Sequence, residues 1–434
     1  MSAAGTVGTT SATSVLIIAD DLSGAADCAI GFAGAGRRTV VTLDSQAGDA
    51  GATVIAADTD TRRLTPAEAA ERTAQAWNDL RAPGRRLYKK IDSTLRGNWT
   101  AEVAALQPLA GLAIVAPAFP ATGRTVRDGR VFVHGAPLET TDTWKLEHAG
   151  RAPGLQPMLE AAGLRTALLA ADVLRGEPRM LRERIAAAAA GGTQALIVDT
   201  ETGADLAALA QVSAAMSEPL FWVGSGGLAR ELAALPDLFD PASTARADAA
   251  RPVPAGAILI LVGSLSAVSE RQCAMLRERA GVAELIVPPV VLREGERHEA
   301  WSEWDERIGA GLRAGADLIV RIGRDNAFDP AEGARLSTAL AALVAPHFGH
   351  LGGLIATGGE TARAMLGAAG IGSLELLAEV EAGVAVARPA TAAFPAIVTK
   401  AGAFGSEHAL YGAYRHLRGA PETQHPGASA VAAR

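Results

Sequence analysis

The chain of 434 residues has few of the groups that mark metal sites, membrane spans or secreted frameworks. Its two cysteines are Cys28 and Cys273, and no cysteine–histidine spacing resembles a zinc site. No window approaches the ~20 apolar residues of a membrane span. The N-terminal MSAAGTVGTTSATS lacks the basic and apolar regions of a signal peptide. We therefore expect no protein metal site, no membrane partner and a reducing cytoplasmic location.

Positive charge, and lysine in particular, is also scarce. The formal net charge of −7 argues against nucleic acid as a partner. Of 40 basic residues only four are lysine, namely Lys89, Lys90, Lys145 and Lys400. Because the chain uses arginine almost everywhere else, these lysines either serve where a compact, mobile ammonium is needed or reflect chance in a small sample.

What the chain does have is a regular alternation of strand-like and helix-like segments. The chain is longer than one domain with a single hydrophobic core usually is, and 49% hydrophobic residues are typical of globular proteins. This alternation predicts an α/β fold of two domains, each with a mainly parallel sheet flanked by helices. The expected strands are 15–19, 39–43, 53–57, 87–91, 112–115, 195–199, 220–223, 257–262, 284–287, 317–322, 353–356 and 396–399, and expected helices include 66–80 and 102–109.

A stretch rich in Pro, Ala, Asp and Ser, without an apolar period, interrupts this alternation at 241–256 and predicts a linker. It separates a first domain, 15–240, from a second, 257–419. Residues 1–14 are expected to form a disordered leader, and residues 420–434 a disordered tail.

Two adjacent carboxylates, Asp20 and Asp21, end the first apolar strand in the run IIADDLSGAAD. A helix follows at once, and ligands of α/β proteins bind at such strand-to-helix turns. One aspartate could cap the helix. The second needs another explanation, so this turn is a candidate catalytic site.

The run LYKKIDSTLRGN is a second candidate. If Leu87–Ile91 is a strand, Lys90 and Asp92 point to one side, and Ser93 lies at the turn into the next helix. Arg96 would then lie in that helix's first turn, where it opposes the dipole and needs an anionic partner. An Asp92–Lys90 pair and a Ser93 cap would explain the rest but not Arg96. We predict a pocket for a polyhydroxylated acid here.

Two further stretches of the first half carry weaker signals. Arg62 or Arg63, in the run DTDTRR after another strand, could bind a substrate carboxylate as a bidentate fork, or the run could be a solvated charge cluster. The run FWVGSGGLAREL, residues 221–232, is a strand–glycine–helix turn that could face a ligand or only pack the domain end.

Three glycine-rich strand-to-helix turns occur in the second half. Glycine permits close approach of a ligand to the backbone, and the helix starts offer amides to anions. Together they predict a polyphosphate site with Lys400 near the β- and γ-phosphates. There is no G-x-G-x-x-G after a strand, which argues against a dinucleotide. The predicted nucleotide site lies within these turns, whose residues include Ser264, Thr357, Gly358, Gly359, Glu360, Thr361, Lys400 and Gly402.

In this order, IADDLSGAAD, KKIDSTLRGN, APAFPATGRT, VGSGGLA, GSLS, ATGGETA and KAGAFG resemble the four-carbon acid sugar kinase family, over 15–419. The resemblance implies a sugar-acid-binding domain, a nucleotide-binding domain and an active site in the cleft between them. It implies ATP-dependent phosphorylation of a terminal hydroxyl on threonate, erythronate or 3-oxo-tetronate. The segment 144–164 departs from the family pattern, which bears on the identity of the acid.

Carried over by motif, the resemblance assigns Asp20, Asp21, Arg62 and the run from Lys90 to Ser93 to the sugar acid. It assigns to ATP the residues Ser264, Gly358 to Thr361 and Gly402. We expect one aspartate to be the general base and the other to cap the helix or orient basic side chains. Arg62, Lys90 and Arg96 would hold the substrate carboxylate, and Mg²⁺ would bridge the phosphates with few protein ligands.

Other functions remain open from the sequence. One is a non-catalytic sensor of sugar acids, against which the aspartate pair and Lys400 argue. Others are a kinase for a different small hydroxy acid and a nucleotide-independent or NAD-linked sugar-acid enzyme. A homodimer is the assembly we consider.

Overall fold

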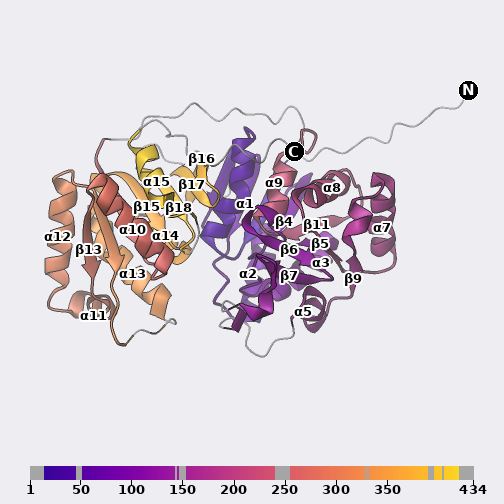
Figure 1. The fold of residues 1–434 in the computed structure, drawn as a ribbon, viewed down its shortest axis with the longest axis horizontal. Coiled ribbons are helices and arrows are strands. Elements are labelled where there is room, and N and C mark those ends of the chain that lie inside the picture. The colour runs from indigo at the N-terminus through magenta and orange to yellow at the C-terminus, as the bar shows by residue number, and fades with distance from the viewer. Residues whose placement is uncertain are drawn as a thin grey trace, which may run out of the picture. The chain divides into compact units, whose positions relative to one another are not determined.

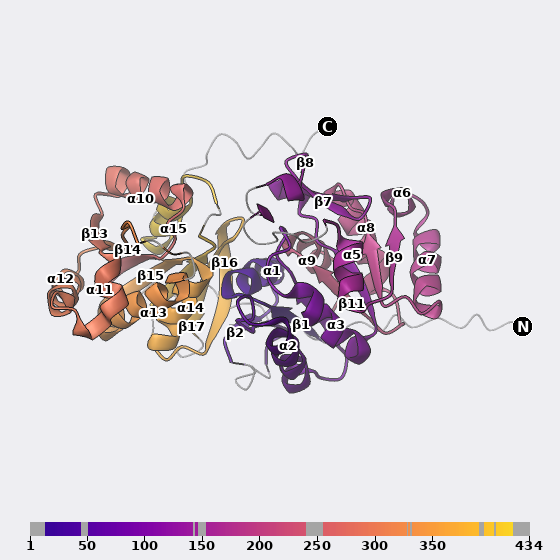
Figure 2. The same ribbon diagram turned by 90° about the horizontal axis from the view of Figure 1, so that it is seen from below.

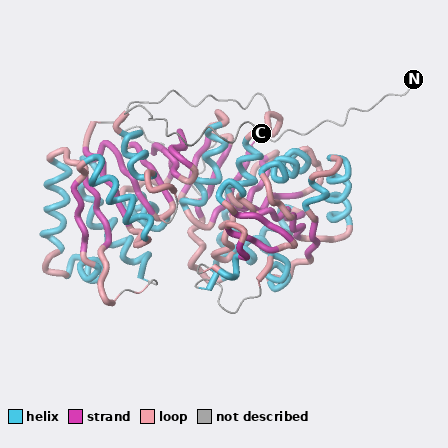
Figure 3. The backbone as a smooth tube through the Cα atoms, in the orientation of Figure 1, coloured by secondary structure: helices cyan, strands magenta, loops and turns pink. Residues whose placement is uncertain are grey.

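The computed structural model describes residues 14–44, 51–141, 144–145, 153–239, 255–327, 329, 332–389, 395–402 and 405–419. The predicted leader apart from Ser14, the predicted linker apart from residues 255 and 256, and the predicted tail lie outside these residues. Contacts divide the chain into two compact units, one of residues 1–249 with 372–378 and one of the remainder. Helices alternate with strands throughout both (Figures 1 and 3).

The first unit contains a mainly parallel sheet in the order β16-β2-β3-β1-β4-β11-β5-β10-β9. Only β16, whose first residues pair with β2, runs antiparallel. Edge strand β9 has α7 beside it in both views (Figures 1 and 2). The strands are β1 (Ser14–Ala19), β2 (Thr39–Thr42), β3 (Val54–Asp58), β4 (Arg85–Lys90), β5 (Leu112–Ala116), β9 (Thr166–Leu169), β10 (Ala195–Val198), β11 (Leu220–Gly224) and β16 (Ser373–Glu381).

Helices flank this sheet, and a small three-stranded antiparallel sheet follows β5. The α-helices are α1 (Leu22–Gly34), α2 (Pro66–Leu80), α3 (Trp99–Ala110), α5 (Leu155–Ala161), α6 (Ala171–Leu174), α7 (Pro178–Ala190), α8 (Gly203–Ala214) and α9 (Gly226–Ala233). The small sheet consists of β6 (Arg124–Arg127), β7 (Arg130–Val133) and β8 (Ala136–Pro137), flanked by the 3₁₀ turns Pro120–Thr122 and Leu138–Thr140.

The second unit has the strand order β13-β14-β12-β15-β18-β17, parallel except for β17. Edge strand β13 and helix α12 lie at the same end of it (Figure 2). The strands are β12 (Ala257–Val262), β13 (Ala283–Val287), β14 (Leu318–Ile322), β15 (Leu351–Thr357), β17 (Val384–Pro389) and β18 (Ala396–Lys400). The helices are α10 (Ala267–Ala280), α11 (Pro289–Glu294), α12 (Trp301–Arg313), α13 (Gly333–Val344), α14 (Gly359–Ala368) and α15 (Ala409–Leu417), with 3₁₀ turns Gly295–Arg297 and Ala345–His350.

Burial explains why these segments form strands. The central strands β1, β12 and β15 are buried along their whole length, as parallel strands covered by helices on both faces must be. Every strand expected from an apolar run is present within two residues at each end. The α/β prediction is therefore confirmed. Within the described residues no helix is both long and apolar enough to span a bilayer.

Candidate active site

The carboxyl ends of β3, β1 and β4 lie side by side, because these strands are parallel neighbours. Asp20 and Asp21 follow β1 directly. Asp21 has extended backbone and caps α1, its Oδ1 accepting a hydrogen bond from the Gly24 N–H at 3.1 Å. The helix-capping role expected for one aspartate therefore belongs to Asp21.

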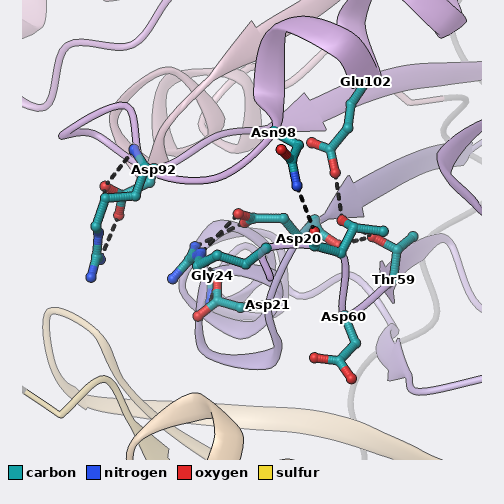
Figure 4. Close-up of polar contacts among 12 residues, drawn as sticks. Asp20, Asp21, Gly24, Thr59, Asp60, Asp92, Asn98 and Glu102 are labelled. Atoms are coloured by element: carbon teal, nitrogen blue, oxygen red, sulfur yellow. Dashed lines mark hydrogen bonds and ion pairs between the residues drawn. The ribbon is translucent and has the colours of Figure 1, made fainter. Parts of the chain in front are cut away.

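Arg62, from the loop after β3, holds both aspartates (Figure 4). It donates Nε to Asp20 Oδ2 and Nη2 to Asp20 Oδ1, each at 2.8 Å, and Nη2 also reaches Asp21 Oδ1 at 2.8 Å. Burial would raise the pKa of Asp20, but the charge and hydrogen bonds of Arg62 hold that pKa below its ordinary value. Asp20 is thus an ionised, fully engaged carboxylate that orients Arg62.

A buried polar network fixes the loop that carries Arg62. Thr61 donates its hydroxyl to Glu102 Oε1 at 2.5 Å, and Asn98 donates its amide to the Thr61 carbonyl at 3.0 Å (Figure 4). Glu102 also forms an ion pair with Lys89 at 2.8 Å, and both side chains are wholly buried. Sequence reasoning missed this support; its one signal was a glutamate inside an apolar helical run.

A second arginine–aspartate pair follows β4. Asp92 accepts Arg96 Nη2 at 2.8 Å and Nε at 3.0 Å, and it also accepts the Thr94 amide and hydroxyl. These contacts hold the pKa of Asp92 well below its ordinary value against the effect of burial. Arg124 lies near enough for the charges of Asp92 and Arg96 to act on its pKa, which burial lowers.

Arg96 does not lie in a helix, so that prediction is wrong. α3 begins only at Trp99, and the segment before it is a turn in which Leu95 and Gly97 have φ of 63° and 84°. A Cβ on Gly97 would lie 2.7 Å from Asp20 Oδ2, so this glycine lets the turn approach the aspartate. The anionic partner expected for Arg96 is Asp92, which also replaces the alternative of an Asp92–Lys90 pair.

Lys90 and Ser93 lie at the same edge. Both are buried, at 5% and 9% exposure. The Lys90 ammonium lies against the first turn of α1, 2.8 Å from the point that a Cβ on Gly24 would occupy. The structure therefore brings Asp20, Asp21, Arg62 and Lys90 to one edge, and Asp92 with Arg96 follows the neighbouring strand.

The GSGG turn after β11 is a packing element. A Cβ on Gly224 would meet the Tyr88 hydroxyl at 2.6 Å, one on Gly226 would meet Asp27 Oδ2 at 2.6 Å, and one on Gly227 would meet the Ala118 carbonyl at 2.4 Å. Because protein atoms already fill the space beside each glycine, the structure supports the packing interpretation of this run.

In the second unit the three predicted turns follow β12, β15 and β18, which are adjacent and parallel, so the turns share one edge. Gly402 packs on Ser264: a Cβ there would lie 2.7 Å from Ser264 Oγ. Gly358 donates its amide to the Lys400 carbonyl at 2.8 Å. Gly359 begins α14, whose start has no side-chain cap.

Hydroxyls line this second edge. Thr361 shares a hydrogen bond of 3.0 Å with Ser337, and Ser269 donates to the Gly402 carbonyl at 2.8 Å. Thr357 Oγ1 is buried without a hydrogen-bond partner among the described residues. Glu360 is half-buried at the start of α14. Residues 403–404 of the predicted third turn lie outside the described residues.

Lys400 is 1% exposed and donates Nζ to the carbonyls of Ala401 and Gly402, at 2.8 and 3.0 Å. Burial lowers its pKa to about 8. In this structure the ammonium braces the turn that follows it. No three His, Cys, Asp or Glu side chains gather as metal ligands in the part of the chain that the structure describes.

Comparison with known proteins places these two edges in named domains. A model of a sugar-binding N-terminal domain matches residues 15–232, and a model of a nucleotide-binding C-terminal domain matches residues 259–410. A Cupriavidus necator protein named D-threonate kinase is 56% identical over 93% of this chain and 97% of its own. A D-threonate kinase of Bordetella bronchiseptica is 35% identical over the same shares of the two chains.

A crystal structure of a Salmonella typhimurium LT2 protein shares the fold, with a TM-score of 0.78 at 23% identity over 93% of this chain and 99% of that one. Together the two domain matches span most of the sequence in the order that the motifs predicted. The chain therefore belongs to the four-carbon acid sugar kinase family, a family of ATP-dependent sugar-acid kinases.

Proposed function

We propose that this chain transfers the γ-phosphoryl group of ATP to the terminal hydroxyl of D-threonate. Support for this acid comes from the two relatives named D-threonate kinase, one of them 56% identical. L-threonate, erythronate and 3-oxo-tetronate are the competing acceptors. Part of the atypical segment, 144–164, lies outside the described residues.

The observation that carries the mechanism is the unequal engagement of the two aspartates. Both oxygens of Asp20 are bonded to Arg62, and its side chain is 3% exposed. Asp21 uses only Oδ1, for Gly24 and Arg62, and is 20% exposed; within the described residues Oδ2 makes no hydrogen bond or ion pair. Asp21 is therefore the general base, held in place by its other oxygen, and Asp20 orients Arg62.

The sugar acid binds beside this base in our proposal. Arg62 and Arg96 each engage a protein carboxylate through Nε and Nη2, which in our proposal leaves their Nη1 groups to the substrate. The planar guanidinium suits a substrate carboxylate. Asp92 and Ser93 complete the acid-binding residues of this proposal and offer acceptors and a donor to hydroxyls. Lys90, also predicted to bind the acid, lies beside the proposed base.

ATP binds at the turns after β12, β15 and β18 in our proposal. Ser264, Gly358 to Thr361 and Gly402 offer hydroxyls and backbone amides, and the uncapped start of α14 favours an anion. Lys400 would exchange its carbonyl partners for a phosphate. Mg²⁺, when bound, neutralises phosphate charge. We propose that it arrives with the nucleotide, because Mg²⁺ in kinase sites is held largely by substrate phosphates and water.

Release of ADP from ATP and Mg²⁺ tests the proposal across D- and L-threonate, D- and L-erythronate and the 3-oxo-tetronates. We expect turnover with D-threonate, lowered about 10²–10⁴-fold in Asp21→Asn. Asp20→Asn is the matched control, because it disturbs the same arginine without removing the base. Turnover that survives in Asp21→Asn and is lost in Asp20→Asn would reverse the two roles. Silence across the panel would overturn the substrate class. The cytoplasmic location and the homodimer stay predictions.

A further inference from the structure

Two neighbouring lysines on β4 have opposite environments. Lys89 is wholly buried and paired with Glu102 at 2.8 Å. Lys90 is 5% exposed, yet it makes no hydrogen bond and no ion pair within the residues that the structure describes. A lysine buried to this degree without a hydrogen bond or ion pair is costly, so it points to an anionic ligand beside it.

The surroundings of Lys90 also favour a bound anion. Its ammonium lies over the first turn of α1, a helix of 13 residues, against Gly24. The first amides of a helix lack intrahelical partners and carry partial positive charge, so a cation there is unfavourable unless an anion lies between them. Neither aspartate bonds to Lys90. Arg62 holds both oxygens of Asp20, and Oδ1 of Asp21 accepts hydrogen bonds from Gly24 and Arg62.

Ser23, at the second position of α1, supplies a further unsatisfied group. It is 7% exposed, and its Oγ has no hydrogen-bond partner among the described residues. Glycine is needed at position 24 because Asp21 and Lys90 both approach its backbone closely: a Cβ there would lie 2.4 Å from Asp21 Oδ1 and 2.8 Å from Lys90 Nζ. Lys90 and the base Asp21 therefore flank the same point of the helix.

The position of the base decides which anion belongs here. Asp21 must touch the acceptor hydroxyl, and the phosphorus becomes bonded to that same oxygen, so the transferred group passes beside Asp21. The carboxylate at the other end of the acid suits the Arg96 end of the edge, where Arg124 also lies near. A lysine ammonium, as a compact charge with rotatable donors, suits a phosphoryl group.

We propose that Lys90 Nζ, Ser23 Oγ and the first amides of α1 bind the phosphoryl group during transfer and the phosphate of the product afterwards. This rests on the proposed function. The acceptor oxygen forms its bond to phosphorus while the bond from phosphorus to the bridging oxygen of ADP breaks. The proton of the hydroxyl passes to Asp21.

Binding measurements on Lys90→Met test this assignment by calorimetry, with D-threonate and D-threonate phosphorylated on its terminal hydroxyl as the two ligands. We expect the affinity for D-threonate to change less than about threefold and that for the phosphorylated acid to fall more than about tenfold. Turnover should fall about 10²–10³-fold, as for loss of one oxyanion donor. Ser23→Ala should show the same pattern, more weakly.

Equal losses for both ligands would overturn the assignment, because Lys90 would then hold the carboxylate that they share. Unchanged binding of both would overturn it as well. Lys90→Met removes no hydrogen bond or ion pair within the described residues, so the melting temperature of the variant should not fall. Circular dichroism checks that the variant is folded. The affinities for D-threonate and for its phosphorylated form can be compared without turnover. A wild type that binds D-threonate but phosphorylates nothing would therefore contradict the proposed function and not the assignment of Lys90.

Discussion

The carboxyl edges of the two sheets differ in the chemical groups that line them. In the first unit the edge consists of charged side chains: Asp20 and Asp21 share Arg62, and Asp92 holds Arg96. In the second unit it consists of glycines, hydroxyls and backbone carbonyls. Even its lysine is bonded to backbone oxygens.

This difference fits the two substrates of a sugar-acid kinase. A small acid whose hydroxyl must lose a proton needs a base and fixed side-chain charges around it. A nucleotide carries its own charge and is commonly held by backbone amides at helix starts. The first edge should therefore respond to changes of charge, and the second to changes of backbone packing.

Lys89→Met should give the largest effect on stability. It removes one partner of the buried pair with Glu102 and leaves that carboxylate uncompensated, which costs about 3–5 kcal/mol of unfolding free energy. Urea unfolding measures this. Lys90→Met, one residue away, is the control and should lack this loss. Equal destabilisation by both variants would remove the distinction between a structural and a ligand-binding lysine.

Arg62→Lys should impair catalysis more than folding. Lysine keeps the charge but cannot make the two-pronged contact with Asp20, so the acid-binding groups lose their orientation. We expect kcat/KM for the acid to fall about 10–10²-fold through lost charge-assisted hydrogen bonds. KM for ATP should stay unchanged. A matching rise in that KM would mean that the first edge also holds the nucleotide.

Gly402→Ala should act on the nucleotide alone. The new Cβ would lie 2.7 Å from Ser264 Oγ and force two turns apart, which raises KM for ATP about tenfold or more. Gly367→Ala is the matched control, since a Cβ there meets nothing within 4 Å and should stabilise α14 by about 1 kcal/mol. If both variants bind ATP equally, the turns are not the nucleotide site.

The pH dependence should differ slightly between the edges. Burial lowers the pKa of Lys400 to about 8, so the folded protein loses this proton at a pH where the unfolded chain keeps it. Stability from Lys400 thus rises as the pH increases above about 8, while ATP affinity falls a few-fold as the ammonium is lost. The pKa values of Asp20 and Asp92 are lowered, so both stay ionised there. ATP affinity that is constant between pH 7 and 9 would argue against a phosphate contact by Lys400.

The sequence predicted the parts of the fold that depend on local pattern. Branched apolar runs such as Val15–Ala19 predicted buried strands, and the 66–80 period predicted α2 at its observed bounds. Strands β9, β16 and β17 were not predicted. Edge and partly exposed strands lack a continuous apolar run, and SLELLAEVE contains residues suited to helices as well as strands.

For the candidate site, the sequence indicated residue types but not the pairing of their side chains. The Asp20–Arg62 contact joins residues 42 positions apart, and no local pattern encodes it. Arg96 was placed in a helix because nothing in STLRGN indicates that the backbone of Leu95 adopts the left-handed conformation. Glu102 gave only a weak signal, a glutamate inside an apolar helical run, because a buried carboxylate is recognised only once its lysine is seen.

Separate titrations of ATP and D-threonate into Asp21→Asn and Gly402→Ala test most directly the claim that one edge serves the acid and the other the nucleotide. We predict that Asp21→Asn binds ATP like the wild type while turnover is lost, and that Gly402→Ala binds D-threonate like the wild type while ATP affinity falls. Loss of ATP affinity in Asp21→Asn, or of D-threonate affinity in Gly402→Ala, would contradict this division.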